Sequence, residues 1–337
     1  MAKTTNREIA KLAGVSPAAV SIAMNGKTGI SEETRERILN IARQLNYCTN
    51  STSAKVLRER STYIAALFRT DMQMADQVFY SEMCNNAMAA CKDLGYTLVS
   101  TYITGEDSSL ELPPAIRFSE VDGVLIFGDQ KPGIYAELKR INIPFVVLDS
   151  CRPFTPHPSI YVDYNDTAYR ATRHLIELGH RDLVFFSNSI LHEFNTHILD
   201  GFQKATMEAN ISLYPNRIQL MDDVHEDAIR MSVERALAGA GRPTAFLCCS
   251  DFYALKVIYT LCTMGYRIPE DISVIGMDDI NMAKLVYPGL TTMRVDRDIM
   301  LSQGLQMLTN LMRGEHCASR ILPAPELVVR GTTAPVG

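Results

Sequence analysis

The chain has 337 residues, of which 47% are apolar, so it can bury more than one hydrophobic core, and we expect two or three domains. Ordinary counts of Gly (19) and Pro (15) exclude a collagen-like or disordered chain, and the net charge of −5 argues against nucleic-acid binding over the whole surface. The charge is uneven, because residues 1–60 carry ten Lys and Arg against five Glu, a net charge of +5, and the remainder carries −10. Unless this is chance scatter, attraction to phosphates is local to the N-terminal part.

The eight cysteines show neither a CxxC pair nor metal-ligand spacing with His, and some lie in apolar runs such as FLCC at 246–249. This usage favours small core residues in a reducing compartment over a disulfide framework or a metal site. The first ten residues, MAKTTNREIA, hold no apolar signal core, and no apolar run approaches the ~18 residues of a membrane span. We therefore expect a cytoplasmic protein that binds neither a metal nor a membrane.

Two short helical segments flank the turn AGVS at residues 13–16. In the first, Thr5 and Glu8 form a capping box. Its inner face is predicted to carry Ile9, Leu12 and Ala13. Gly14 suits the positive φ of a tight turn. In the second segment, Ser16 serves as N-cap and Pro17 occupies the first helical position. The inner face of this segment is predicted to carry Val20, Ala23 and Met24.

A third helix is expected from Ser31, whose hydroxyl caps it while Glu32 and Glu33 complement the helix dipole. Its apolar positions are Ile38, Ile41 and Leu45. Three short helices that close on one small core are typical of a helix–turn–helix domain, whose second helix enters the major groove of DNA.

The segment IAKLAGVSPAAVSIAMNGKTGISEETRERILNIARQLNY, residues 9–47, resembles the N-terminal domain of the lactose-repressor/galactose-repressor family. The resemblance implies a DNA-binding domain over residues 1–47. It places three side chains at the base edges: Pro17, Ala18 and Ile22. None of them forms a side-chain hydrogen bond, so we expect apolar contact with thymine methyl groups and a contribution from DNA deformability. The phosphates would be held by Thr5, Ser16, Ser21 and Asn25. The alternative is that Pro17 only starts the helix and that Asn6 or Arg7 contacts the bases.

Residues 48–60 match the segment that in this family forms a hinge helix on DNA and inserts a leucine into the minor groove. By resemblance, Leu57 is that leucine and Lys55 the accompanying basic residue, and Asn50, the asparagine that precedes the helix, is a further candidate DNA-binding residue. Thr49 stands where the family usually has proline, and the spacing from Asn50 to Leu57 is one residue longer than usual. An apolar wedge of this kind unstacks a base step and bends the DNA. The alternative is a flexible Ser/Thr linker without a wedge.

From residue 61 onward, β-rich runs alternate with helical patterns, which predicts an α/β body with doubly wound parallel sheets. The expected strands are Tyr63–Phe68, Tyr96–Thr101, Gly123–Phe127, Phe145–Asp149, Asp182–Phe186, Ala245–Cys249 and Ile272–Gly276. The expected helices between them include Tyr80–Leu94, Thr167–Leu178, Glu226–Ala238 and Tyr253–Met264.

The stretches HLIELGHRDL at 174–183 and GYRIPEDISVIGMDD at 265–279 resemble the effector domain of the same family, which is similar to periplasmic sugar-binding proteins. The resemblance implies two lobes joined by three crossovers, which we place near 158–162, 287–292 and 318–323. Residues 61–337 then form the effector-binding and dimerisation domain. Lobe one spans 61–160 and 291–320, and lobe two spans 161–290 and 321–337.

Ligands of such sheets bind beyond the carboxyl ends of the strands, in the cleft between the lobes. By this rule and the resemblance, Asp149, Ser250 and Asp278 are candidate effector-binding residues, and Phe79 and Tyr80 would stack on a sugar ring. The alternative for each polar residue is a loop or helix cap, above all for Asp251. The family's effector-gripping arginine is replaced by Ile198, so the effector is expected to be unusual, weakly bound or absent, unless His192 or His197 takes part.

Together these features predict a homodimeric transcription regulator, most simply a repressor, whose affinity for operator DNA changes when a carbohydrate-like effector binds. The alternative is a cytoplasmic sugar-binding protein without a regulatory role. An enzyme is not expected, because no GxSxG, P-loop, GxGxxG or metal-spaced His pair is present, and no cofactor is expected either. The chain ends in VVRGTTAPVG without heptads, which favours a dimer over a tetramer.

Overall fold

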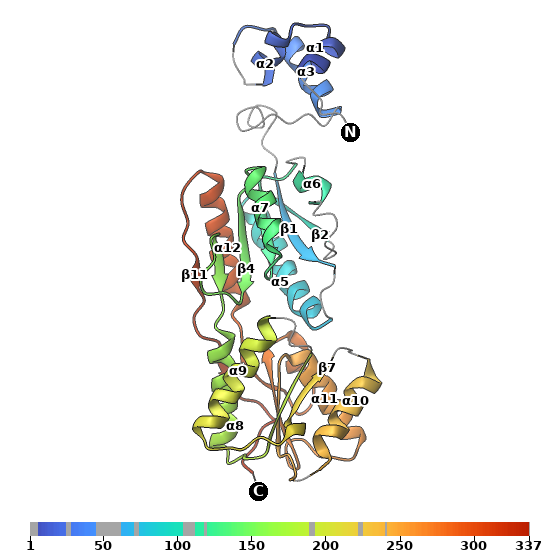
Figure 1. The fold of residues 1–337 in the computed structure, drawn as a ribbon, viewed down its shortest axis with the longest axis vertical. Coiled ribbons are helices and arrows are strands. Elements are labelled where there is room, and N and C mark those ends of the chain that lie inside the picture. The colour runs from blue at the N-terminus through green and yellow to red at the C-terminus, as the bar shows by residue number, and fades with distance from the viewer. Residues whose placement is uncertain are drawn as a thin grey trace.

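The computed structural model describes residues 6–24, 28–44, 62–70, 74–103, 112–117, 120–188, 193–221, 225–239 and 241–336. Figure 1 shows the α/β body as two sheets with their helices, placed one after the other along its long axis. Five predicted DNA-binding residues lie outside the described residues, as does the whole predicted hinge segment at 48–60. These five are Thr5, Asn25, Asn50, Lys55 and Leu57.

Among its described residues, the N-terminal part contains three short helices, α1 (Asn6–Ala13), α2 (Pro17–Met24) and α3 (Glu32–Gln44), which close on a core of their own. Val20, Ala23 and Met24 are buried, as predicted. The prediction for Leu12 was wrong, because this side chain is 61% exposed. Ile9, Ala10 and Ala13 fill the inner face of α1, and Leu12 lies beyond its edge.

The caps of these helices follow the predicted pattern. The Ser16 hydroxyl accepts the backbone N–H of Ala19 at 3.1 Å at the start of α2. The Ser31 hydroxyl accepts the N–H of Thr34 at 3.2 Å at the start of α3. Gly14 has φ +65°, which a residue with a side chain adopts only with strain. The turn between α1 and α2 is therefore fixed by local chemistry.

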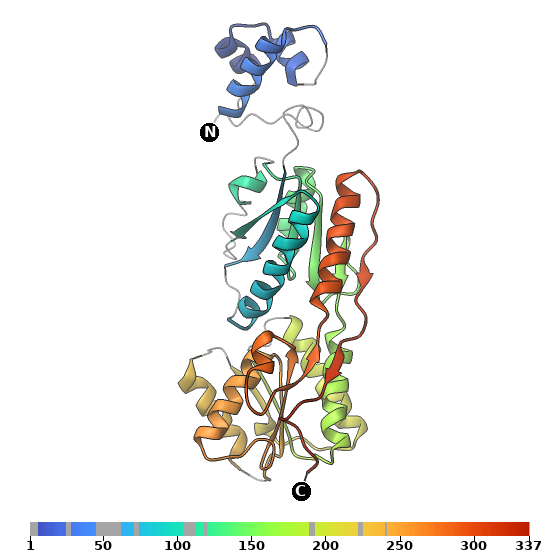
Figure 2. The same cartoon turned by 180° about the vertical axis from the view of Figure 1, so that it is seen from behind.

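The first sheet of the body is parallel throughout and has the order β11-β5-β4-β3-β1-β2. Its strands are β1 (Tyr63–Arg69), β2 (Thr97–Ile103), β3 (Gly123–Phe127), β4 (Phe145–Ser150), β5 (Ser159–Tyr161) and β11 (Arg320–Ile321). Helices α5 (Met74–Asp93) and α12 (Arg297–Met312) pack side by side on one face (Figure 2). Helices α6 (Pro114–Arg117) and α7 (Pro132–Arg140) cover the other. Alternate residues of β1 enter these two cores, as the strand period requires.

The second sheet has the order β12-β10-β9-β8-β6-β7, and β12 is antiparallel to β10 while the other pairs are parallel. Its strands are β6 (Leu183–Asn188), β7 (Ile218–Met221), β8 (Ala245–Cys248), β9 (Ser273–Asp278), β10 (Thr291–Arg294) and β12 (Glu326–Val328). Helix α8 (Tyr164–Glu177) packs on α9 (Glu193–Glu208), and α10 (Glu226–Leu237) packs on α11 (Asp251–Thr263). Two 3₁₀ turns are described in this half: η1 (Pro215–Arg217) precedes β7 and η2 (Asn281–Lys284) follows β9.

The chain passes between the two sheets three times: after β5, between β10 and α12, and between β11 and β12. The second crossing lies later than the predicted 287–292, because β10 pairs with β9 and so keeps residues 291–294 in the second sheet. The predicted boundary between the lobes at residues 320 and 321 also differs from the structure by one residue. Ile321 pairs with Tyr161 and so still belongs to the first sheet. A sequence pattern does not show which strand a short segment pairs with, and this explains both differences.

Candidate functional site

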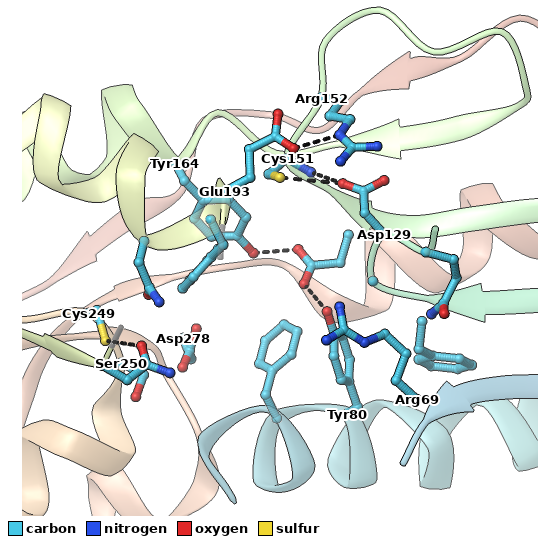
Figure 3. A pocket seen from close by; sticks show the side chains of 18 of the residues that line it. Arg69, Tyr80, Asp129, Cys151, Arg152, Tyr164, Glu193, Cys249, Ser250 and Asp278 are labelled. Carbon is cyan, nitrogen blue, oxygen red and sulfur yellow. Dashed lines mark hydrogen bonds and ion pairs between the residues drawn. The ribbon is translucent and has the colours of Figure 1, made fainter. Parts of the chain in front are cut away.

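A cavity of about 350 Å³ lies between the two sheets, at the carboxyl ends of β3 and β4 on one side and of β6, β8 and β9 on the other. Figure 3 shows that its polar side chains converge from both sides. Its aromatic lining consists of Phe79, Tyr80, Phe127, Tyr164, Phe194 and Tyr253. Its polar lining includes Arg69, Asp129, Gln130, Lys131, Asp149, Arg152, Asn188, Glu193, Asn195, Ser250 and Asp278. The site therefore combines carboxylates with aromatic faces.

Asp149 lies near the end of β4, is only 9% exposed, and has φ +63°. Its Oδ2 accepts the hydroxyl of Tyr80 on α5 at 2.8 Å, and its Oδ1 accepts the hydroxyl of Tyr164 at the start of α8 (Figure 3). Burial, reinforced by the carboxyl of Asp149, holds the pKa of Tyr164 well above its usual range, so this hydroxyl stays a donor. Because α5 packs on the first sheet and α8 on the second, Asp149 joins both halves of the body.

The second sheet contributes two predicted residues to the cavity. Asp278 ends β9, is 7% exposed, and has φ +114°, a backbone conformation that is strained for a residue other than glycine. Ser250 lines the cavity and also caps α11, where its hydroxyl accepts the N–H of Tyr253 at 3.4 Å. The cap of α11 is thus Ser250 rather than Asp251.

Asp251 itself is fully buried and does not line the cavity. Its carboxyl accepts the N–H of Ile280 at 2.9 Å and the hydroxyl of Thr292. Burial raises the pKa of Asp251 to about 8. This residue therefore holds the segments after β8 and β9 to strand β10.

The aromatic side chains of the cavity contact one another edge to face, with interplanar angles of 66–78°, rather than in parallel stacks. The rings of Phe79 and Tyr80 are 5.3 Å apart, and Tyr80 lies 5.9 Å from Phe127. Tyr164 and Phe194 are 4.5 Å apart. This arrangement leaves apolar ring faces that suit the apolar side of a sugar or the plane of a base.

A polar cluster that sequence reasoning missed lies at the loop after β4 (Figure 3). The carboxylate of Asp129 accepts the hydroxyl of Ser150 at 3.0 Å, and the N–H and Sγ–H of Cys151 at 3.0 and 3.4 Å. Burial, and then the charge of Asp129, raises the pKa of the Cys151 thiol well above its usual range. Arg152 Nε donates to Glu193 Oε2 at 2.7 Å, an ion pair that links this loop to α9. Asp129 lies just after the end of β3. The same kind of strand-end position identified Asp149 and Asp278, so this signal was present for Asp129 as well.

Five of the six predicted effector-binding residues line the cavity: Phe79, Tyr80, Asp149, Ser250 and Asp278. Ile198 does not, so its assignment to the site is corrected. It is completely buried in α9 and belongs to the main hydrophobic core. His197 is half-buried beside Glu193, with Nε2 and Oε1 3.9 Å apart, and His192 lies outside the described residues.

The outer surface of α2 is short of hydrogen-bonding side chains, as the sequence suggested. Pro17, Ala18 and Ser21 are exposed and Ile22 is half-buried. The hydroxyl of Ser16 is already engaged as the helix cap. The surface that a helix–turn–helix domain places in the major groove is therefore mostly apolar.

Two family models match the chain: bacterial regulatory proteins of the lacI family over residues 5–50, and the periplasmic binding protein-like domain over residues 172–333. The HTH-type transcriptional repressor PurR of Aliivibrio salmonicida (strain LFI1238) is 30% identical over 331 residues, which cover 97% of this chain and 98% of that protein. The ribose operon repressor of Haemophilus influenzae is 31% identical over 290 residues, 86% of each chain. The chain belongs to the LacI family of bacterial regulatory proteins.

Solved structures of LacI-family regulators share the fold of the whole chain. The lac repressor dimer bound to operator and the anti-inducer ONPF superposes with a TM-score of 0.67 at 24% identity, covering 99% of this chain and 100% of that one. The complex of the transcriptional regulator CelR with cellobiose gives a TM-score of 0.66 at 22% identity, with 98% and 99% covered. The predicted fold class, helical N-terminal domain and two-lobed α/β body, is confirmed.

As a LacI-family member the chain is a DNA-binding transcriptional regulator that responds to an effector, and it is not an enzyme. Among the helices that the structure describes, none has the length and apolar character needed to cross a bilayer.

Proposed function

We propose that this LacI-family regulator represses transcription as a homodimer on a two-half-site operator, and that a carbohydrate or carbohydrate derivative in the cavity changes its operator affinity. The proposal assigns residues 1–47 to DNA binding, 48–60 to the hinge, and 61–337 to effector binding and dimerisation. It also assigns the protein to the cytoplasm, where operator DNA lies.

The observation that carries the effector proposal is the pairing of buried carboxylates with aromatic rings in one cavity. Asp149 and Asp278 accept hydrogen bonds from hydroxyl groups, and Phe79 and Phe194 offer ring faces to the apolar side of a pyranose or furanose. The related ribose operon repressor, and a structural neighbour of 22% identity and TM-score 0.69 with bound ribose, support the carbohydrate class.

Ile198 is buried and stands where the family resemblance predicts an arginine, so this part of α9 has no guanidinium group directed at the ligand. We therefore assign the grip on the ligand to the carboxylates and to Ser250, which together bind hydroxyl groups. The five donors of an arginine suit the recognition of a carboxylate or of paired hydroxyl groups, and the isoleucine removes that recognition from α9.

The same proposal assigns operator recognition to the apolar face of α2. Pro17, Ala18 and Ile22 would contact thymine methyl groups in the major groove, while Ser21 and backbone N–H groups hold phosphates. The basic N-terminal segment supplies the electrostatic attraction, because residues 1–60 carry a net charge of +5.

Coupling between the two functions follows from the position of the cavity between the sheets. A ligand that contacts both sheets stabilises one relative arrangement of the lobes, and the lobes carry the DNA-binding parts of the dimer with them. Leu57 and Lys55 of the proposed hinge helix would then meet the operator in only one of the arrangements.

Two experiments on the full chain test the proposal. Selection of duplexes from a random pool should enrich a palindromic sequence with thymine in both half-sites, whereas enrichment of no sequence over random competitor contradicts it. A thermal-shift panel of carbohydrates and nucleosides should identify a ligand that raises the melting temperature by mass action.

Two variants then test the cavity. Asp278→Ala should lose most of this ligand-induced shift, whereas the matched control Asp200→Ala, which removes an exposed carboxylate from α9, should retain it. Equal shifts in both variants would remove Asp278 from the effector site. Comparing operator binding with and without the ligand shows whether the cavity controls the DNA-binding domain.

A further inference from the structure

Three side chains that ligate metals in many proteins converge at the edge of the cavity: Cys151, Glu193 and His197. The thiol sulfur, a carboxylate oxygen and a ring nitrogen all lie within 4.8 Å of one another. Cys151 follows β4 of the first sheet, and the other two residues belong to α9 of the second. The group therefore brings together ligands from both lobes, and it includes donors of three chemical kinds rather than carboxylates alone.

Glu193 and His197 are four residues apart, so they lie on one face of α9. His197 Nε2 and Glu193 Oε1 are 3.9 Å apart, which is too long for a hydrogen bond. Within the part of the chain that the structure describes, His197 Nε2 is buried and has no hydrogen-bond partner. A buried ring nitrogen without a partner is unfavourable, because it has lost its water without replacement. The contact with Glu193 therefore does not replace the hydrogen bond that this nitrogen would make with water.

The remaining contacts of the cluster orient its ligand atoms. Glu193 uses Oε2 to accept Arg152 Nε at 2.7 Å, which leaves Oε1 directed at His197. Asp129 Oδ2 accepts the Cys151 thiol at 3.4 Å and so supplies a further oxygen beside the cluster (Figure 3). Hydrogen bonds of this kind to a ligating carboxylate are a regular feature of metal sites.

We propose that Cys151, Glu193 and His197 bind a divalent transition-metal ion of the Zn²⁺ class, with the fourth position filled by Asp129 or water. One thiolate, one imidazole and one carboxylate form a mixed ligand set that suits Zn²⁺, whereas Mg²⁺ and Ca²⁺ require oxygen ligands. Tetrahedral bonds of about 2.0–2.3 Å separate ligand atoms by roughly 3.5 Å. Side-chain rotations that bring the three atoms inward by about 1 Å reach this geometry. On binding, the sulfur–hydrogen bond is replaced by a sulfur–metal bond, and the proton leaves to solvent.

A metal ion in this position would link the loop after β4 to α9 and so hold the two lobes together beside the effector cavity. Its binding would favour the lobe arrangement shown in Figure 1 over arrangements that separate Cys151 from α9. The metal site does not depend on the proposed carbohydrate effector or on operator recognition, and its test uses neither.

Titration of the metal-free full chain with Co²⁺ tests the site, since a cobalt–thiolate bond has a near-ultraviolet charge-transfer absorption that carboxylate and imidazole ligands lack. We expect one Co²⁺ per chain, the thiolate band, and loss of that band when Zn²⁺ is added. Cys151→Ser should abolish the band, and His197→Gln should weaken Co²⁺ binding at least tenfold. Cys262→Ser, which removes an exposed cysteine on α11, is the matched control and should leave the titration unchanged.

Circular dichroism and thermal melting of each variant separate loss of binding from loss of folding. His197 is only half-buried, so its glutamine variant remains informative if Cys151→Ser fails to fold. The proposal is overturned if the folded chain gives no thiolate band, if the band survives in Cys151→Ser, or if it disappears in Cys262→Ser.

Discussion

Gly201 in the middle of α9 should not tolerate even an alanine. A Cβ at this position would lie 2.1 Å from the backbone oxygen of Asn165 and 2.9 Å from the backbone nitrogen of Tyr169, both in α8. An ordinary contact begins at 3.4 Å. Because both neighbours are backbone atoms, no side-chain rotation relieves the overlap, and the two helices must move apart.

The magnitude follows from this displacement. The helices must separate locally by about 1.3 Å, and a gap of even about 1 Å loses up to about half of the dispersion energy of the atoms that line it. Overpacking of this kind costs about 3 kcal/mol, of which the better helix propensity of alanine returns about 1 kcal/mol. We expect Gly201→Ala to lower the free energy of unfolding by about 2 kcal/mol and the melting temperature by roughly 4–8 °C.

Thermal melting of the full chain, followed by circular dichroism, measures this effect. The matched control is Gly304→Ala in α12, where the new Cβ would meet the end of the Leu148 side chain at 2.3 Å rather than backbone. Leu148 can change its rotamer, so the control should lose less stability. A melting temperature for Gly201→Ala at or above that of the unmodified chain would refute the reasoning, as would a larger loss in the control.

Three further results are expected. Asp251 is protonated in the fold up to its pKa of about 8 but ionises near pH 4 in the unfolded chain, so the free energy of unfolding should fall as pH rises between these values. Urea unfolding across this pH range should show a weaker dependence on pH for Asp251→Asn than for the unmodified chain, and an equal dependence would contradict the assignment. Tyr164→Phe removes a buried donor to Asp149 and should lower the free energy of unfolding by about 1–3 kcal/mol in urea titrations; a change near zero would show that this hydrogen bond contributes little. Replacing thymine by uracil opposite Ile22 in both half-sites removes two methyl contacts of about 0.8 kcal/mol each, so operator binding measured by fluorescence anisotropy should weaken roughly 15-fold. The variant Ile22→Ala should bind the thymine and uracil duplexes equally.

Most of the longer elements of the fold were predictable because each carries a pattern of its own, although α9 and α12, with 16 residues each, were not named from the sequence. All seven expected strands and all four expected body helices are present, with ends that differ by a few residues. The strands that were not predicted, β5, β7, β10, β11 and β12, have four residues or fewer. Such segments are too short for a period, and their strand conformation comes from pairing with distant parts of the chain, as β11 pairs with β5.

The site was predictable where a residue follows a strand directly. Asp149 and Asp278 were identified by that rule, since the carboxyl ends of parallel strands meet at the cleft. Tyr164 was missed because it begins a helix, where Asp163 provides the cap and the hydroxyl reaches Asp149 across the cavity. Glu193 was missed for a similar reason, because its partner Arg152 lies 41 residues earlier, in the other lobe.

The error at Ile198 shows what a resemblance cannot transfer. A side chain reaches a cavity only if its environment favours exposure there. The close packing of α9 on α8 at Gly201 and the apolar character of isoleucine both favour the core, so the side chain is completely buried. An arginine at the same position has a charge to keep hydrated or paired, and would not pack in this way.

Asp149 connects the two lobes at the proposed effector site. Its two carboxyl oxygens each accept one tyrosine hydroxyl, from Tyr80 beside the first sheet and from Tyr164 beside the second. A carboxylate oxygen accepts two hydrogen bonds, so a ligand hydroxyl can join at either oxygen, or replace a tyrosine that turns away. In the first case the ligand strengthens the connection between the lobes, and in the second it releases it. Under the proposed function, the sign of the effector's action on operator binding depends on whether the ligand adds to the two tyrosines at this carboxylate or displaces one of them.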